Sequence, residues 1–66
     1  MTDFKELAKQ YRNCAAYVGI DMDENRIVYV VMIEDMDGNS VDRIPFAYRD
    51  DAEELSDAIN EEVSYD

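Results

Sequence analysis

A run of seven apolar residues, 27–33 (IVYVVMI), constrains the fold of this 66-residue chain more than any other feature. The run is rich in β-branched residues, which favour a strand. A strand with one solvated face alternates apolar and polar residues, but here both alternating sets of side chains are apolar. The run is also far shorter than the ~20 residues that span a membrane. It therefore predicts the central strand of a small sheet, with both faces requiring cover.

A second strand is predicted just before this run. Residues 17–22 alternate between apolar and small or polar side chains, which is the period of a strand. Asp23-Glu24-Asn25 is a turn signal, and the central strand then covers residues 26–34. Strands joined by so short a turn are expected to pair antiparallel.

The third strand, residues 41–48, follows a turn at residues 35–39, in which Gly38 or Asn39 can take a positive φ. Pro45 lies inside this strand and has no N–H to donate, so the strand is expected at an edge of the sheet. An antiparallel meander in the order 1-2-3 puts the apolar strand at the centre and satisfies this requirement.

Two helical patterns flank the sheet. In residues 3–15 apolar side chains recur at helical spacing, and Asp3 with Glu6 fits a capping box. A second helix is expected to begin at Asp50 or Asp51, since each aspartate fits the N-cap. This helix runs to about residue 63, and its apolar stripe is formed by Ala52, Leu55, Ile59 and Val63.

The expected fold is therefore a single α+β domain over residues 1–66, built as a helix, a three-stranded antiparallel meander and a helix. Two arrangements of the helices remain open. They lie on opposite faces of the sheet, or both lie on one face and the other face is an interface. In the second arrangement Val30, beside Tyr17 and Ala47, would lie in an apolar surface that supports a homodimer. We favour the self-contained monomer over the homodimer.

The charge of the chain excludes several functions. The chain has 17 acidic residues, 6 basic residues and no histidine, which gives a net charge of −11. Phosphate would be repelled, so neither nucleic acid nor an anionic membrane is expected as a direct partner. Without histidine the chain lacks the usual general base and the commonest zinc ligand, and no cofactor or metal is expected. Acids in turns and on an exposed helix have no pocket to separate their pKa values, so we expect no enzyme.

The expected compartment follows from the cysteine count and the start of the sequence. Cys14 is the only cysteine, so no intrachain disulfide can form. Within residues 1–20, the charged side chains of Asp3, Lys5, Glu6, Lys9 and Arg12 leave no apolar segment typical of a signal peptide. We expect a cytoplasmic protein.

The acids concentrate towards the end of the chain, where residues 50–66 hold eight acids and no base. At 100° per residue, the second helix gathers most of them opposite its apolar stripe. Like charges at i, i+4 each destabilise a helix by about 0.2–0.5 kcal/mol, and no base relieves them. The predicted acidic surface comprises Asp50, Asp51, Glu53, Glu54, Asp57, Glu61 and Glu62 of the helix, with corners at the turns formed by Asp21, Asp23, Glu24, Glu34, Asp35 and Asp37.

This unrelieved row of carboxylates has two interpretations. The first is an imitation of nucleic acid, in which the acids fill Lys and Arg sites shaped for phosphates. The second is the solvated face of an acidic protein. The one-sidedness and the lack of interleaved bases favour the first. The partner would then be a basic nucleic-acid-binding protein, and association would be fast and salt-sensitive.

In size, element order and acidic second helix, the whole chain resembles the small phage-encoded anti-CRISPR proteins that act as DNA mimics. It is similar to small inhibitors of type I CRISPR systems, such as type I-C. The resemblance implies that the partner is a CRISPR surveillance complex whose binding of target DNA is blocked. It also implies that the acids named above occupy basic residues of a DNA-contacting subunit. A phage-encoded chain would act in the cytoplasm of the bacterial host.

A second class of function fits the same features. A small acidic interaction module, of the antitoxin, immunity or anti-restriction type, would bind a partner protein through the apolar second face of the sheet. A mimic should lose its partner with added salt and on neutralisation of Glu54, Asp57 and Glu61. A module should be little affected by salt and should fail when Val30 or Met32 is made charged.

Overall fold

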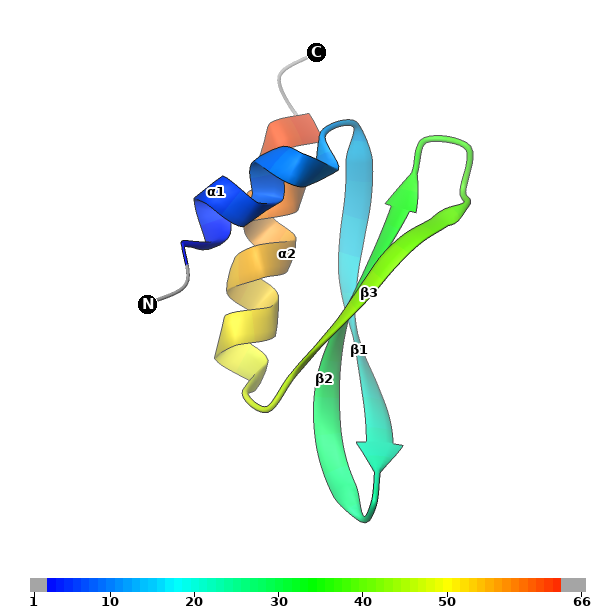
Figure 1. Ribbon diagram of the computed structural model, residues 1–66, viewed down its shortest axis with the longest axis vertical. Helices are drawn as coiled ribbons and strands as arrows, with labels where there is room; N and C mark the ends of the chain where they lie inside the picture. The colour runs from blue at the N-terminus through cyan, green and yellow to red at the C-terminus, as the bar shows by residue number, and fades with distance from the viewer. Residues whose placement is uncertain (1–2, 64–66) are drawn as a thin grey trace.

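The computed structural model describes residues 3–63 and, of Val63, only the backbone. Its elements follow the predicted order of helix, three-stranded antiparallel sheet and helix, with the strands in the order β1-β2-β3 (Figure 1). The α+β fold class is therefore confirmed. The elements are α1 (Phe4–Ala8), the 3-10 helix η1 (Lys9–Tyr11), β1 (Cys14–Asp23), β2 (Arg26–Asp35), β3 (Ser40–Phe46) and α2 (Arg49–Val63).

The first helix is shorter than predicted. It ends at Ala8 and continues as a turn of 3-10 helix to Tyr11, so the prediction of a helix through residue 15 was wrong. Asn13 has a φ of 62°, a left-handed conformation that ends a helix and that asparagine tolerates. Cys14 and Ala16, both buried at strand spacing, then begin β1.

Asp3 caps α1 as predicted. Its carboxylate accepts the backbone N–H groups of Lys5 at 3.1 Å and Glu6 at 3.3 Å. The Glu6 carboxylate, which the capping box assigned to the start of the helix, pairs instead with Lys9 Nζ at 3.2 Å. The side-chain cap of α1 is therefore provided by Asp3, and Glu6 takes no part in it.

The second helix begins at Arg49, before the predicted start at Asp50 or Asp51. Both aspartates lie in the first turn, where the helix dipole favours their negative charge, and not at the N-cap. The carbonyl of Tyr48 accepts the N–H of Ala52 at 3.3 Å. The chain is therefore already entering the helix at Tyr48, and the third strand ends before this residue.

The turns and the edge strand follow the sequence closely. Glu24 and Asn25 form a two-residue turn with φ values of 48° and 66°, the left-handed pair that matches the twist of a hairpin. In the second turn, Gly38 takes the positive φ, at 86°. It was one of the two residues predicted to do so. Pro45 lies opposite Val30 on β3, an edge strand, as predicted.

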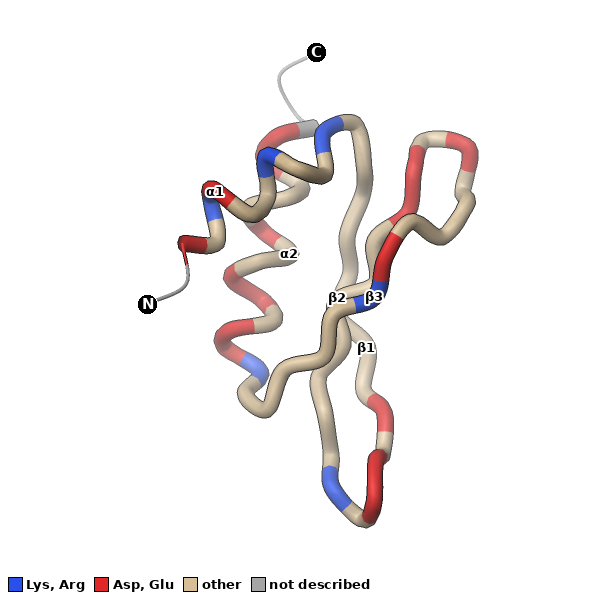
Figure 2. Tube along the Cα trace, viewed as in Figure 1, with Lys and Arg blue, Asp and Glu red and all other residues tan. Residues whose placement is uncertain are grey.

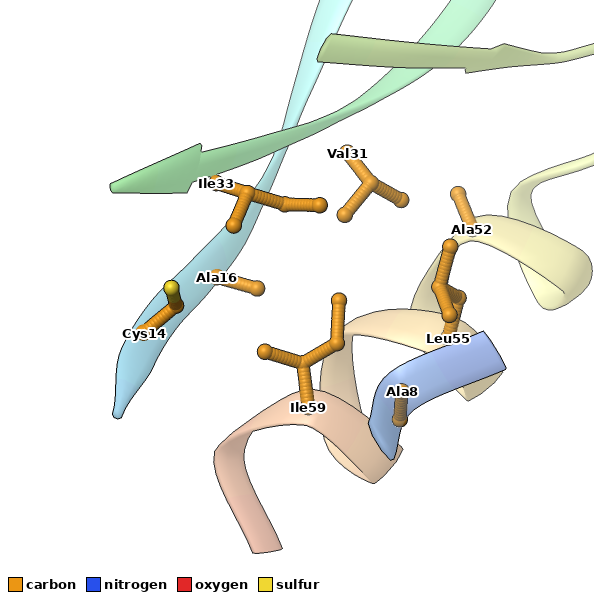
Figure 3. Packing of buried hydrophobic residues seen from close by; sticks show 8 residues of the cluster. All are labelled: Ala8, Cys14, Ala16, Val31, Ile33, Ala52, Leu55 and Ile59. Atoms are coloured by element: carbon orange, nitrogen blue, oxygen red, sulfur yellow. The ribbon is translucent and has the colours of Figure 1, made fainter. Parts of the chain in front are cut away.

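The core lies between the helices and one face of the sheet. Figure 3 shows side chains of α1, α2, β1 and β2 converging on one cluster. Both helices therefore cover the same face, as the second of the two arrangements expects for the helices. The buried cluster consists of Ala8, Cys14, Ala16, Val31, Ile33, Ala52, Leu55 and Ile59.

Val30 is only 3% exposed although it belongs to the sheet face opposite the helices. Arg43 of β3 and Asp21 of β1 form an ion pair. Asp21 lies opposite Val28 and Arg43 lies opposite Met32, so this pair reaches diagonally across β2 over Val30. The centre of the second face is therefore shielded by the chain's own charged side chains.

Asn60 of α2 caps the edge of β1. Its Oδ1 accepts the N–H of Ala16, and its Nδ2 donates to the C=O of Ala16, both at 2.9 Å. The side-chain amide thus takes the place of the peptide group of a neighbouring strand. Because an unpaired strand edge invites pairing with other chains, Asn60 both anchors α2 and closes this part of the edge.

Replacing Asn60 with alanine is expected to lower the free energy of unfolding by about 1–3 kcal/mol, because the backbone groups of the buried Ala16 lose their partners. Asn60→Asp is the matched variant, since its carboxylate accepts the N–H but cannot donate to the C=O. Its loss should be at least as large as that of the alanine variant, because a carboxylate oxygen then faces the C=O of Ala16 with no hydrogen to donate. Urea denaturation monitored by circular dichroism measures the free energy of unfolding of wild type and both variants. Equal values for the three proteins would contradict the role given to Asn60.

Candidate functional site

The exposed face of α2 carries a ridge of carboxylates. Its opposite face packs Ala52, Leu55 and Ile59 fully into the core. Asp51 and Glu62 lie half-buried at the flanks, as the helical projection predicts. The remaining five acids of the helix are exposed and are called the acidic ridge here: Asp50, Glu53, Glu54, Asp57 and Glu61.

The acidic ridge has a charge density close to that of one DNA strand. An α-helix rises 1.5 Å per residue, so the carboxylates from Asp50 to Glu61 are spread over about 16 Å, one every ~4 Å. One strand of B-DNA carries a phosphate every ~3.4 Å of helix axis. A groove lined with Lys and Arg for phosphates would meet a comparable row of negative charges on α2.

The observed helix α2 includes one basic residue, Arg49. The predicted helix lacked it, because its predicted start was Asp50 or Asp51. Its Nε lies 3.0 Å from Oε1 of Glu53, one turn along α2. Both side chains are largely exposed, so the pair adds little stability and exchanges readily with other partners. It neutralises one end of the acidic ridge in the free protein.

An open groove of about 310 Å³ lies between α1 and α2, along the acidic ridge. Its lining is formed by apolar Phe4 and Ala58, by Lys5 and by four acidic residues. This combination suits the side chain of a Lys or Arg, whose aliphatic stem packs on apolar surface while its charged head meets carboxylates. The four acids of the lining are Asp3, Glu54, Asp57 and Glu61.

The acids predicted at the turns do not join the acidic ridge. Figure 2 shows that the acidic segments of α2 lie apart from those at the two turns of the sheet, and that α1 and β3 carry further acids. Asp21, Asp23 and Glu24 lie at the β1–β2 turn, and Glu34, Asp35 and Asp37 lie at the β2–β3 turn. The predicted site residues therefore lie as a ridge on α2 and as two corners at the turns, away from the ridge.

Two of these turn acids have partners within the sheet. The pKa of Asp21 is lowered by the backbone N–H of Met22, which it accepts at 2.8 Å, and by the Arg43 guanidinium. The pKa of Asp35 is lowered by the backbone N–H of Asn39, accepted at 2.9 Å. Both carboxylates therefore organise the fold, and the acidic ridge is the better candidate for a partner.

Asp42, which the sequence did not single out, joins the first helical segment to the sheet. The hydroxyl of Tyr11 in η1 donates to Asp42 Oδ2 at 2.6 Å. This hydrogen bond is the main cause of a lowered pKa for Asp42 and raises the pKa of Tyr11 to about 12. The folded state therefore favours a neutral Tyr11 beside an ionised Asp42.

The stability that this pair contributes is expected to vanish at both extremes of pH. Because the pKa of Asp42 is lowered from 3.8, its contribution is complete above that value and is lost as the pH falls below it. Because the pKa of Tyr11 is raised from 10.0 to about 12, its contribution is complete below pH 10.0 and is lost towards pH 12. Tyr11→Phe should therefore be less stable than wild type between about pH 5 and 9 and equal to it at both extremes. Urea denaturation from about pH 2 to pH 12 measures the difference, and a difference that stays constant over that whole interval would contradict the assignment.

Within residues 3–63, no three His, Cys, Asp or Glu side chains are placed so that they could hold a metal ion. No helix in the described part of the chain is long and apolar enough to cross a membrane. No family model, curated protein or solved structure matches the chain.

Proposed function

We propose that this protein is an inhibitor that occupies a nucleic-acid-binding protein by presenting the acidic ridge in place of DNA. The observation that carries the proposal is the one-sided row of carboxylates on α2, whose average charge density along the helix axis is close to that of one DNA strand. The row is held rigidly, because Ala52, Leu55 and Ile59 fix the opposite face of the helix in the core. A partner therefore meets a preformed surface and loses little entropy in ordering it.

The destabilising character of the acidic ridge supports a binding role. Glu53, Asp57 and Glu61 follow one another at i, i+4, and each like-charge pair costs about 0.2–0.5 kcal/mol. Arg49 pairs with Glu53 at the start of this row. A solvated face has no need of such repulsion, since interleaved Lys residues would make the same helix more stable.

The groove between α1 and α2 gives the proposed interaction a specific anchor. One Arg or Lys of the partner would enter it, pack along Phe4 and Ala58, and form charge-assisted hydrogen bonds with Glu54 and Asp57. The remaining acids of the ridge would pair with further basic residues around it. Such a contact excludes DNA because both ligands require the same cations.

The resemblance to anti-CRISPR inhibitors makes a type I CRISPR surveillance complex the first partner to test. In this proposal the protein competes with target DNA for the basic subunit surface and does not bind nucleic acid itself. Long-range attraction between the −11 charge and that surface would speed association. A small interaction module that uses an apolar surface is the alternative.

The proposal is tested with a purified type I-C surveillance complex and its labelled target duplex. Protein added before the DNA should abolish DNA binding, and excess duplex should displace the protein from the complex. Raising the salt from about 0.1 to 0.5 M should weaken the protein's own affinity for the complex at least tenfold. Undiminished DNA binding by a complex that holds the protein would contradict mimicry.

If this complex does not bind the protein at all, the identity of the partner is wrong, and a pull-down from bacterial lysate at both salt concentrations tests the wider proposal. Nucleic-acid-binding proteins released by salt are the expected result. Partners retained at both concentrations would favour the interaction module.

A further inference from the structure

The sheet has two edges, β1 and β3, and the β3 edge is closed to further strands. Pro45 has no N–H, and the N–H of Arg43 donates to Asp42 Oδ1 at 2.7 Å. The register of β3 also shifts opposite Ile33 and Glu34 of β2. Proline, blocked donors and irregular pairing are ways in which proteins prevent edge strands from pairing with other chains.

Alternate residues of β1 direct their backbone groups outward, away from β2. The N–H and C=O of Ala16 must point outward, because both bind Asn60 of α2. Val18, Ile20 and Met22 follow Ala16 at the period of a strand, so their backbone groups point the same way. The outward N–H and C=O groups along the β1 edge are therefore those of Ala16, Val18, Ile20 and Met22.

This edge is closed at both ends and open between them. Asn60 closes one end, and at the other the N–H of Met22 donates to its neighbour Asp21 at 2.8 Å. Among residues 3–63, no hydrogen-bond partner is recorded for the outward N–H and C=O of Val18 and Ile20. These four groups are available to pair with a short extended segment.

An exposed apolar strip lies beside the open part of the edge. Ile20, Met22 and Ile27 are 72%, 67% and 57% exposed. Ile20 and Met22 continue the alternation of Val18 along β1, and Ile27 lies opposite Met22, so the three side chains share one face of the hairpin. Figure 1 shows this end of the hairpin projecting beyond both helices, which leaves the strip uncovered.

We propose that the edge of β1 at Val18 and Ile20 binds an extended, basic segment of a partner protein by strand addition. The segment's backbone pairs with the four open groups, which is how peptides bind to exposed sheet edges. Its apolar side chains lie beside the exposed strip. Its Lys or Arg side chains meet the exposed carboxylates of Asp23 and Glu24 at the end of the hairpin.

The negative charge of the hairpin favours a basic segment over a second copy of the chain at this edge. Residues 14–35, which form the hairpin, contain five acids and one base, and the whole chain carries −11. Two copies joined through this edge would bring both sets of acids together. A basic segment is attracted by the same acids that repel a second copy. The inference does not depend on the proposed function, because the edge lies on β1 and the acidic ridge lies on α2.

The test uses a synthetic peptide of alternating valine and lysine, with binding followed by NMR on the ¹⁵N-labelled protein. The amide signals of Val18 and Ile20 should shift most. Two further peptides carry N-methyl groups on the valines only or on the lysines only. Antiparallel addition needs the valine N–H groups and parallel addition needs the lysine N–H groups, so one of the two should bind about tenfold more weakly or worse while the other is unaffected. Equal binding of both would show attraction by charge alone and would overturn the proposal.

A matched pair of protein variants locates the contact. Ile20→Lys places a positive charge on the open edge and should weaken the peptide about tenfold. Ile27→Lys makes the same change on the same face, but on β2, a full strand away from the added segment, and should have a much smaller effect. Equal losses would contradict binding at the edge. If sedimentation shows that the protein alone dimerises and that Ile20→Lys makes it monomeric, the occupant is a second copy and the proposal is wrong.

Discussion

Leu55→Ala is expected to leave much of the protein unfolded at physiological temperature. Leu55 is fully buried where α2 meets the sheet, among the largest buried side chains of the core. Leucine-to-alanine changes in a core cost about 2–5 kcal/mol. A hydrophobic core of this size rarely supplies more than about 3–5 kcal/mol in total. Alanine is the best helix former, so the loss would report packing and not helix propensity.

Circular dichroism during urea denaturation measures this effect, and Leu55→Met is the matched control. Methionine nearly conserves the volume of leucine and should cost less than about 1.5 kcal/mol. A loss below about 1 kcal/mol for Leu55→Ala would mean that the sheet and α2 do not depend on this contact, and it would contradict the core described above.

The sheet could be predicted because its signals are local. The apolar run at residues 27–33 predicted a central strand, and Pro45 predicted an edge strand. Together they gave the strand order that is observed. The cover of Val30 could not be predicted in this way. It comes from Arg43 and Asp21, which lie 22 residues apart and meet only once the register of three strands is set.

The first helix was predicted too long because the position of Cys14 fits both the period of a helix and the period of a strand. It continues the helical spacing from Tyr11, and it also begins the alternation that buries Cys14 and Ala16 in β1. The backbone of Asn13 decides between the two, since its left-handed conformation stops the helix. A single asparagine is a weak signal in a sequence, because asparagine also occurs in ordinary helices and loops.

The acidic ridge could be predicted because it depends only on the spacing of residues within one helix. The groove beside it could not, since Phe4 and Lys5 reach α2 through the packing of α1. The same is true of Asn60, which bonds Ala16 across 44 residues of sequence. Its polar side chain near the end of the helix resembles any solvated residue until the strand edge is placed beside it.

Neutralising the three ridge acids that line the groove is expected to weaken partner binding by about a hundredfold or more. The triple variant Glu54→Gln, Asp57→Asn and Glu61→Gln keeps the size of each side chain and removes its charge. Each position then loses a charge-assisted hydrogen bond to a basic residue of the partner. Titration of the surveillance complex with labelled protein measures the affinity.

The chain offers a matched control with the same change in net charge. Asp23→Asn, Glu24→Gln and Asp37→Asn neutralise three exposed acids at the two turns of the sheet, away from the ridge. This variant should retain most of its affinity and lose only the part due to long-range attraction. Equal losses in the two triple variants would show that the partner senses total charge and not the surface of α2.

The ridge variant should also be more stable than wild type, by about 0.5–1.5 kcal/mol. It removes the like-charge pairs Asp50–Glu54, Glu53–Asp57 and Asp57–Glu61, each of which costs about 0.2–0.5 kcal/mol at i, i+4. A gain in stability together with a loss of binding separates the role of the ridge from that of the fold, because unfolding cannot then explain the lost affinity. If the variant is more stable and still binds with undiminished affinity, the ridge is a solvated face and the mimicry proposal is wrong.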